Sequence, residues 1–240
     1  MPHIEKFHIN GVRAPSVNEV TDSLSKDGLI RNFWRKLGFK KADKVGGAAR
    51  DQGIALASAF ELYRKTGDPK SSVNGKSAKY VKICLQNWHK WYAGSVYTIP
   101  TDALIEPHLV NTVDKYHGSP DVVLADTLMD MEPVLGDDKS KKRFSDYKLL
   151  MNEHAYAMCD SIEVEGKIEK LPWTPPIPRF WFWTYCPDCG NLYPRMHVFD
   201  PAVYQDFLTC MKMREVNAVA EAYFNREATL LNCDHSPQDE

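Results

Sequence analysis

The sequence lacks any long apolar run, because no stretch approaches the roughly eighteen apolar residues that a membrane-spanning helix needs. The start, MPHIEKFHING, has neither the apolar segment of a secretory signal nor the composition of a transit peptide. We therefore expect a cytoplasmic protein, in the host cytoplasm if the source is viral, with no membrane partner. An excess of one charge is lacking too, since 30 Lys and Arg against 32 Asp and Glu leave a formal net charge of −2. Any nucleic-acid surface must then be a local patch.

Cysteine is scarce, and six scattered residues do not form a disulfide framework: Cys84, Cys159, Cys186, Cys189, Cys210 and Cys233. This usage is typical of a reducing compartment. Cys186 and Cys189, in the segment CPDCG, have the spacing of one half of a zinc knuckle at a hairpin tip. The candidate mates are His197, Cys210 and the Cys233-x-His235 pair. None of them reproduces the usual second half, so structural Zn²⁺ and free thiols both stay open.

The order of the expected elements predicts an α/β protein. The pair Asn10-Gly11 predicts a short hairpin, and Ser16 is a candidate helix cap. Apolar periodicity predicts helices over 28–37, 41–66, 76–93, 143–159 and 201–226, and strands over 103–112, 120–126, 132–138, 161–170, 178–186 and 192–199. This order predicts a mixed central β-sheet flanked by helices, after a helical N-terminal part.

The length of 240 residues fits one domain with a sizeable core. Within 1–240 we expect a helical segment at 16–94 and a core at 100–226 that carries the candidate catalytic residues. The cysteine pair forms a candidate knuckle at 184–192, and the polar composition of 228–240 is typical of a loose tail.

Two acidic clusters occur on strand-like runs, in GSPDVVLAD and MEPVLGDDKS. A hairpin that turns near Met129 places Asp121 opposite Asp137, with Val123 paired with Leu135. Side chains alternate along a strand, so Asp137 and Lys139 share one face, while the intervening aspartate points to the other. We therefore expect replacement of that aspartate by alanine to be mild.

Asp121 and Asp137 repel each other at this separation unless a cation lies between them. Carboxylate oxygens suit Mg²⁺ or Mn²⁺. A lysine beside such a metal orients an attacking water, which assigns this role to Lys139. The pattern predicts a site for metal-dependent hydrolysis of phosphodiesters, although a solvated hairpin end with ordinary surface charges fits the same residues.

Six motifs between residues 12 and 160 resemble, in order, those of the PD-(D/E)XK nucleases, in particular the RecB-type exonuclease branch with its phage, mitochondrial and CRISPR-adaptation nucleases. They are Ala14-Pro15-Ser16-Val17-Asn18, Trp34-Arg35-Lys36-Leu37-Gly38, the segment ARDQGIALASAFELYRKTG at 49–67, Gly118-Ser119-Pro120-Asp121, Asp137-Asp138-Lys139-Ser140 and Asn152-Glu153-His154-Ala155-Tyr156. Each motif is degenerate, but the ordered set is fairly specific.

The resemblance implies a restriction-endonuclease-like core and cleavage of DNA with Mg²⁺ or Mn²⁺. It implies an exonuclease that acts on DNA ends in recombination, repair or phage DNA metabolism, with a recombination or single-strand-binding protein as partner. The roles that it implies are metal ligation by Glu61, Asp121 and Asp137, water positioning by Lys139, and supporting positions for Asn152, Tyr156 and Glu106.

The 41–66 helix presents a narrow face of small residues, because Gly53 and Ala57 precede Glu61 at intervals of four. Such a face lets a nucleotide approach closely, and Arg50 and Arg64 lie near it as candidate phosphate contacts. Ordinary helix packing explains the same small residues.

Two positions depart from the family pattern, since its His falls on Ala57 and its Gln on Asn152. The first departure removes one metal ligand and leaves open a weak or inactive nuclease fold that only binds nucleic acid or protein. An RNA endonuclease of the viral cap-snatching type is a further alternative, because it shares Pro-Asp and an acid-x-Lys. Asp146-Tyr147-Lys148 also matches the family by letter, but no apolar strand precedes it.

Overall fold

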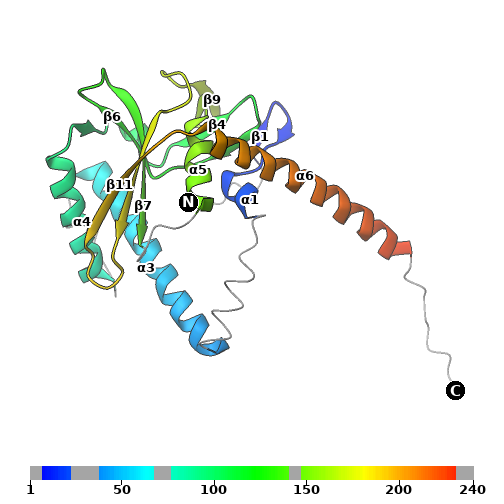
Figure 1. Cartoon of the computed structure of the whole chain (residues 1–240), viewed down its shortest axis with the longest axis horizontal. Coiled ribbons are helices and arrows are strands. Elements are labelled where there is room, and N and C mark those ends of the chain that lie inside the picture. Colours follow the sequence, from blue (N-terminus) through cyan, green and yellow to red (C-terminus); the bar gives the residue numbers. More distant parts are fainter. Residues whose placement is uncertain (1–6, 23–37, 68–76, 141–146, 231–240) are drawn as a thin grey trace.

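The computed structural model describes residues 7–22, 38–67, 77–140 and 147–230. A mixed five-stranded sheet forms its centre, with helices on both faces (Figure 1). In spatial order the strands are β11 (Leu192–Val198), β10 (Arg179–Tyr185), β7 (Glu132–Ser140), β6 (Val122–Asp126) and β3 (Tyr97–Thr98). β7 and β10 are parallel, and the other neighbouring pairs are antiparallel. The predicted mixed central sheet of an α/β protein is therefore confirmed.

The two faces of the central sheet carry different helices. α3 (Phe39–Thr66) and α4 (Ala78–Ala93) cover the face that presents Val122, Leu124 and Val134. The opposite face, with Val123 and Leu135, packs against α1 (Val17–Thr21), α5 (Tyr147–Ala157) and the first turns of α6 (Pro201–Leu230). Each apolar cluster is built from alternate residues of the same strands, as the period of two requires.

The N-terminal segment follows its sequence signals. β1 (His8–Ile9) and β2 (Val12–Arg13) form the predicted hairpin around Asn10-Gly11. Ser16 caps α1, since its hydroxyl accepts from the Glu19 backbone N–H and the Glu19 carboxylate accepts from the Ser16 backbone N–H. This capping box anchors α1. The predicted helix at 28–37 lies outside the described residues.

The β6–β7 hairpin has the predicted register, because Val123 pairs with Leu135 and Val122 with Gly136. Asp121 directly precedes Val122 and Asp137 directly follows Gly136, at the end of the hairpin far from its turn. Gly136 is required by packing, since a Cβ there would lie 2.3 Å from the ring of Trp183. The hairpin therefore brings the two acidic clusters to one end of the sheet.

A second sheet was not predicted. It consists of β5 (Tyr116–Gly118), β4 (His108–Asn111), β8 (Ser161–Val164) and β9 (Lys167–Lys170), in that order. The run expected as one strand at 103–112 divides into the short helix η1 (Asp102–Leu104) and β4, and the run at 161–170 is the β8–β9 hairpin. Apolar patterning alone does not reveal these breaks.

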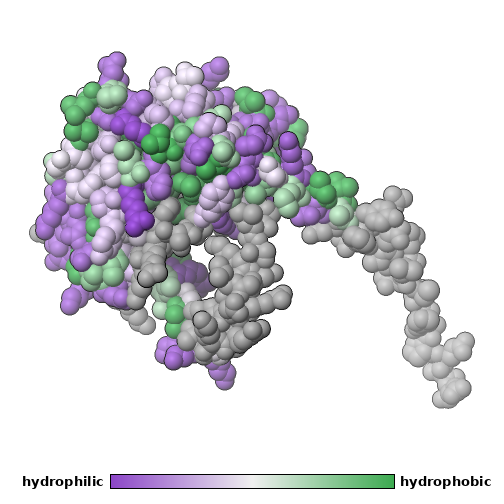
Figure 2. Space-filling model, in the orientation of Figure 1, coloured by the Kyte–Doolittle hydropathy of each residue, from purple (hydrophilic) through white to green (hydrophobic). Residues whose placement is uncertain are grey.

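The last helix, α6, extends away from the rest of the molecule (Figure 1). Its first turns bury Val203, Phe207 and Cys210 in the core, whereas Val216 and Val219 are exposed. It runs four residues beyond the predicted end at Arg226, to Leu230. Figure 2 shows separate apolar patches among the hydrophilic side chains of the visible surface. None of the helices in the described ranges is both long enough and apolar enough for a membrane span.

Candidate active site

Three predicted residues meet at the end of the β6–β7 hairpin. The ammonium of Lys139 lies 2.5 Å from Oδ1 of Asp137 and 3.9 Å from Oδ2 of Asp121. The same Asp121 oxygen accepts a 2.6 Å hydrogen bond from the backbone N–H of Asp138, which fixes this carboxylate against β7. Strand pairing and side-chain alternation therefore bring together the three residues that were predicted from the sequence as the site.

Burial dominates the electrostatics of this group. The side chain of Asp137 is 5% exposed, and burial raises its pKa to about 8 even though Lys139 opposes the shift and Asp121 adds to it. Burial works to lower the pKa of Lys139, but the Asp121 and Asp137 carboxylates outweigh it and raise that pKa above its ordinary value. Oδ2 of Asp137 is buried and has no hydrogen-bond partner.

Glu153 on α5 belongs to this group, although the sequence reasoning did not single it out. It is 1% exposed, and neither of its carboxylate oxygens has a hydrogen-bond partner. Burial raises its pKa well above the ordinary value, and the charge of Asp137 raises it further, while Lys139 opposes the shift. The available signal was its position three residues before Tyr156, on the same helix face.

The two supporting residues on α5 have different surroundings. Tyr156 is buried, and burial followed by the charges of Glu153 and Asp137 raises its phenol pKa. Asn152 instead joins α5 to α1, since its amide donates to Oδ1 of Asn18 at 2.9 Å and accepts from the Thr21 hydroxyl at 2.8 Å. Both ends of the Asn152 amide thus stabilise a helix contact rather than contacting Lys139.

A second, more exposed acidic group adjoins Asp121. The backbone N–H of Glu106, a residue with a φ of 50°, donates to the Asp121 carbonyl at 3.0 Å. Burial raises the Glu106 pKa, and the charges of Glu61 and Asp121 add to the shift. Glu61 itself forms a 2.7 Å ion pair with Lys65, one turn further along α3. Asp121 therefore belongs to an inner, buried acidic group with Asp137 and Glu153. It also adjoins an outer, half-exposed acidic group that consists of Glu106 and Glu61.

The predicted small-residue face of α3 is open. Ala57 is exposed, and a Cβ built on Gly53 meets no atom within 4 Å. Arg50 is also on the surface, with 76% of its side chain exposed and Asp51 as its neighbour at 3.8 Å. Gly53, Ala57 and Arg50 are therefore accessible to a large ligand.

Arg64 corrects a prediction. Its guanidinium pairs with Asp138, and both side chains are only 2% exposed. The hydroxyl of Tyr185 donates to the other Asp138 oxygen at 2.9 Å, and the guanidinium lies 4.9 Å from the ring centroid of Trp88. Arg64 is therefore buried in an ion pair instead of facing a phosphate. The expectation that Asp138→Ala is mild for cleavage stays a prediction, but the change should lower the stability of the fold, because Asp138 neutralises a buried cation.

The cysteine pair forms the turn between β10 and β11, which docks on α4. The Gly190 carbonyl accepts from the Asn87 amide at 2.9 Å, and backbone hydrogen bonds lower the pKa of the Cys186 thiol. Cys84 of α4 is the third thiol at this turn, and burial raises its pKa to about 12. Of the proposed mates, His197 packs on Phe180 and Phe182, and Cys210 lies in the core on the α5 side. Cys233 and His235 lie outside the described residues, and zinc at Cys186 and Cys189 stays a prediction.

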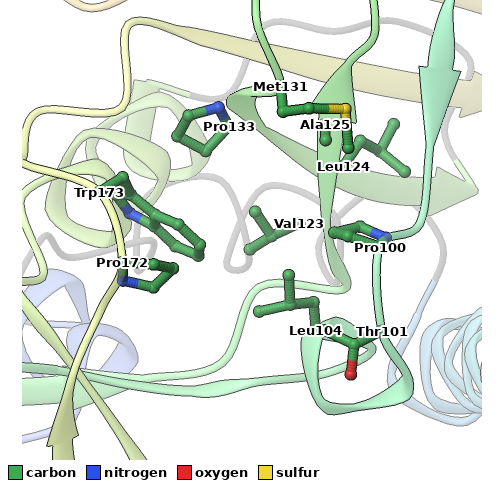
Figure 3. A pocket seen from close by; sticks show the side chains of 10 residues that line it. All are labelled: Pro100, Thr101, Leu104, Val123, Leu124, Ala125, Met131, Pro133, Pro172 and Trp173. Atoms are coloured by element: carbon green, nitrogen blue, oxygen red, sulfur yellow. The ribbon is translucent and has the colours of Figure 1, made fainter.

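An apolar cavity of about 300 Å³ lies near the turn of the β6–β7 hairpin, at the end opposite Asp121 (Figure 3). Its lining consists of Pro100, Thr101, Leu104, Val123, Leu124, Ala125, Met131, Pro133, Pro172 and Trp173. Figure 3 shows Trp173 and Pro172 across the cavity from Val123 and Leu104. With no charged side chain in the lining, this cavity offers no acid–base or metal chemistry.

The inner acidic group fits a divalent cation by its donor chemistry. All its donors are carboxylate oxygens, which Mg²⁺ and Mn²⁺ prefer, and three of these oxygens, on Asp137 and Glu153, are buried without a partner. In the described part of the chain, no three carboxylate, imidazole or thiol groups are already close enough to share one ion. The Lys139 ammonium instead neutralises Asp137.

No protein-family model matches this chain, and no curated protein matches it either. The resemblance to the PD-(D/E)XK nucleases therefore depends on the motif residues themselves.

Proposed function

We propose that this protein is a metal-dependent nuclease of the PD-(D/E)XK type that hydrolyses phosphodiester bonds of DNA. The observation that carries the proposal is the convergence of Asp121, Asp137 and Lys139 at one end of the β6–β7 hairpin. Two carboxylates on paired strands, with a lysine two residues after the second one, are the arrangement that the motif requires.

Each residue of the convergent group has a role in this proposal. Asp121 and Asp137 hold the metal, and Asp121 is already oriented by the backbone N–H of Asp138. When bound, a divalent cation stabilises the charge that develops on the phosphoryl oxygens. Lys139 orients the attacking water, since its ammonium lies among the carboxylates at 2.5 Å and 3.9 Å. Tyr156 packs behind this group.

The surroundings of the site support a nucleic-acid substrate and a restriction-endonuclease-like core. The mixed sheet between helical layers fits that core. The outer acidic group adjoins Asp121, and the α3 face that carries exposed Arg50 is uncovered by the described residues. By the resemblance, the substrate is a DNA end in recombination, repair or phage DNA metabolism, and a recombination or single-strand-binding protein is the partner.

Digestion of matched substrates tests the proposal. The full chain is incubated with Mg²⁺ or Mn²⁺ and linear DNA, covalently closed circular DNA or RNA, with a chelator as the control. Asp121→Asn serves as the matched variant because it keeps the size of the side chain and removes its charge. We expect the wild type to degrade linear DNA, to leave closed circles intact, and to be inactive with the chelator or as Asp121→Asn.

The other outcomes have defined meanings. Cutting of closed circles makes the protein an endonuclease, and preferential cutting of RNA favours the cap-snatching type. Binding of DNA without cleavage under every metal condition favours the inactive binding module, for which the loss of the family His at Ala57 is the sequence signal.

A further inference from the structure

The inner acidic group holds more negative charge than its one cation neutralises. Lys139 pairs with Asp137 through Oδ1, and the charges of Asp121 and Glu153 act on the same ammonium. Oδ2 of Asp137 and both oxygens of Glu153 are buried and have no hydrogen-bond partner among the described residues. Buried carboxylate oxygens are almost always hydrogen-bonded or bound to a cation, so three free ones in a single group point to a missing ligand.

Glu153 is the distinctive member of this group. The residue is 1% exposed, so water does not solvate its carboxylate. Its neighbour Asn152 is held to α1 through Thr21 and Asn18, which fixes the rotation of α5, and the charge of Asp137 on β7 acts on Glu153. A leucine or alanine would fill such a position without the cost of burying a charge. Among the described residues, this buried carboxylate therefore lacks the hydrogen-bond partner that its burial calls for.

Glu61, which the family pattern assigns as the third acidic ligand, has a different environment. Its carboxylate already has Lys65 as a partner at 2.7 Å, and 32% of its side chain is exposed. Water and Lys65 satisfy Glu61 without a metal. The need for a divalent cation is thus greater at Glu153 than at Glu61.

We propose that Glu153 supplies the third carboxylate of the metal site, together with Asp121 and Asp137, and that the ion is held on the α5 face of the central sheet. The three carboxylates must move closer together to share one ion. This inference builds on the proposed nuclease function and names a ligand of the same site. Lys139 competes with the ion for Oδ1 of Asp137, whereas Oδ2 of Asp137 and both Glu153 oxygens are free to coordinate it.

Binding of Mn²⁺ to the full chain without nucleic acid tests the assignment, with free Mn²⁺ measured by electron paramagnetic resonance. The wild type is compared with Glu153→Gln and with the matched change Glu61→Gln, and Asp137→Asn serves as the negative control. We expect Glu153→Gln to weaken Mn²⁺ binding about tenfold or more, and Glu61→Gln to change it less than about twofold. Wild-type affinity in Glu153→Gln, or a larger loss in Glu61→Gln, overturns the proposal.

Thermal unfolding provides a second measurement on the same proteins. In chelator, Glu153→Gln should raise the melting temperature above that of the wild type, because it removes a carboxyl group that is costly to bury without a hydrogen-bond partner. Added Mn²⁺ should then raise the melting temperature of the wild type more than that of the variant. If Glu153→Gln does not fold, Glu153→Asp keeps the charge on a shorter side chain and should also weaken Mn²⁺ binding. Unchanged binding by the Asp variant then overturns the assignment.

These measurements separate the inference from the proposed function. If Asp137→Asn loses Mn²⁺ and DNA cleavage while Glu153→Gln keeps both, the Glu153 assignment fails and the nuclease stands. If Mn²⁺ binds through Glu153 but no nucleic acid is cut, the metal site stands and the nuclease function fails. A wild type that binds no Mn²⁺ overturns both.

Discussion

Two neighbouring aspartates on β7 point to opposite faces of the strand and have different hydrogen-bond partners there. Asp138 points to the α3 and α4 side, where Arg64 pairs with one of its oxygens and the Tyr185 hydroxyl donates to the other. Asp137 points to the α5 side, where Lys139 takes one oxygen and the second has no partner. Both carboxylates are buried, so the difference lies in whether the chain itself satisfies them.

We interpret this difference as separating the structural carboxylate of Asp138 from the carboxylate of Asp137, to which we assign a function. A buried ion pair in which both carboxylate oxygens have protein partners holds α3 to the sheet and needs no ligand. In our proposal, the cation is bound by the buried carboxylate of Asp137, which has one oxygen unpaired by the described residues, beside Glu153 with two more. The sequence letters Asp137-Asp138 do not carry this distinction, which arises from what packs on each face of the strand.

Loss of Lys139 should have the largest effect. Lys139→Met should lower the rate of Mg²⁺-dependent DNA cleavage on the order of 10²–10⁴-fold, because the group that orients the attacking water is gone. Initial rates at saturating Mg²⁺ provide the measurement. Lys170→Met, on an exposed position of β9, is the matched control and should retain the wild-type rate. Full activity of Lys139→Met would contradict the role of this lysine.

Loss of Asp138 should have the second largest effect, which should be a lower stability of the fold. Asp138→Ala leaves the Arg64 guanidinium buried without its partner and should lower the free energy of unfolding by about 3–5 kcal/mol. Urea unfolding measures this, with the exposed Asp51→Ala as control. Adding Arg64→Met to the Asp138 variant should recover much of the loss. A single variant as stable as the wild type means that the ion pair is not formed in solution.

The pH dependence of stability should reveal the raised pKa of Asp137. Burial raises the pKa of Asp137 from 3.8 to about 8, so between these values the folded protein binds more protons than the unfolded chain. The stability that Asp137 contributes is therefore fully present below pH 4 and is lost as the pH rises through 8. Melting temperatures in chelator should fall over this window for the wild type. The fall should be smaller for Asp137→Asn, and an equal fall in both contradicts the assignment.

Replacing either of two glycines by alanine should change the free energy of unfolding by a smaller amount, and the two changes should have opposite signs. Gly136→Ala on β7 places a methyl group 2.3 Å from the Trp183 ring and should destabilise the fold by about 1–3 kcal/mol. Gly53→Ala on α3 meets no atom within 4 Å and should stabilise the helix by about 0.5–1 kcal/mol. Urea unfolding of both variants checks the signs. Two changes of the same sign would indicate that α3 or β7 packs differently.

Local patterning predicted the centre of the site well. The alternation of apolar residues and the midpoint of the hairpin gave the pairing of Val123 with Leu135, and with it the approach of Asp121 to Asp137. The end of α3 could be predicted equally well, because Gly67 follows Thr66 and adopts a φ of 68°. These features depend on residues close in the chain, so the sequence is enough to predict them.

The missed features depend on contacts between distant segments. Arg64 and Asp138 are 74 residues apart, and no local pattern selects a buried ion pair over a surface arginine. The charge of Asp137 on β7 acts on Glu153 of α5, and the position of α5 is fixed by the Asn152 contact with α1, which requires the tertiary packing of both helices. β5 is three residues long, too short for a periodic signal.

In our proposal, the α5 face of β7 is catalytic and the α3 face is structural. The most direct test is the rate of Mg²⁺-dependent cleavage of linear DNA by Asp137→Asn and by Asp138→Asn, each normalised to the folded protein present. We predict that Asp137→Asn loses cleavage on the order of 10²-fold or more, because it removes the carboxylate charge beside Lys139. Folded Asp138→Asn should cleave within about threefold of the wild type, since its side chain faces away from the site. Equal rates in the two variants, or a greater loss in Asp138→Asn, would contradict the account.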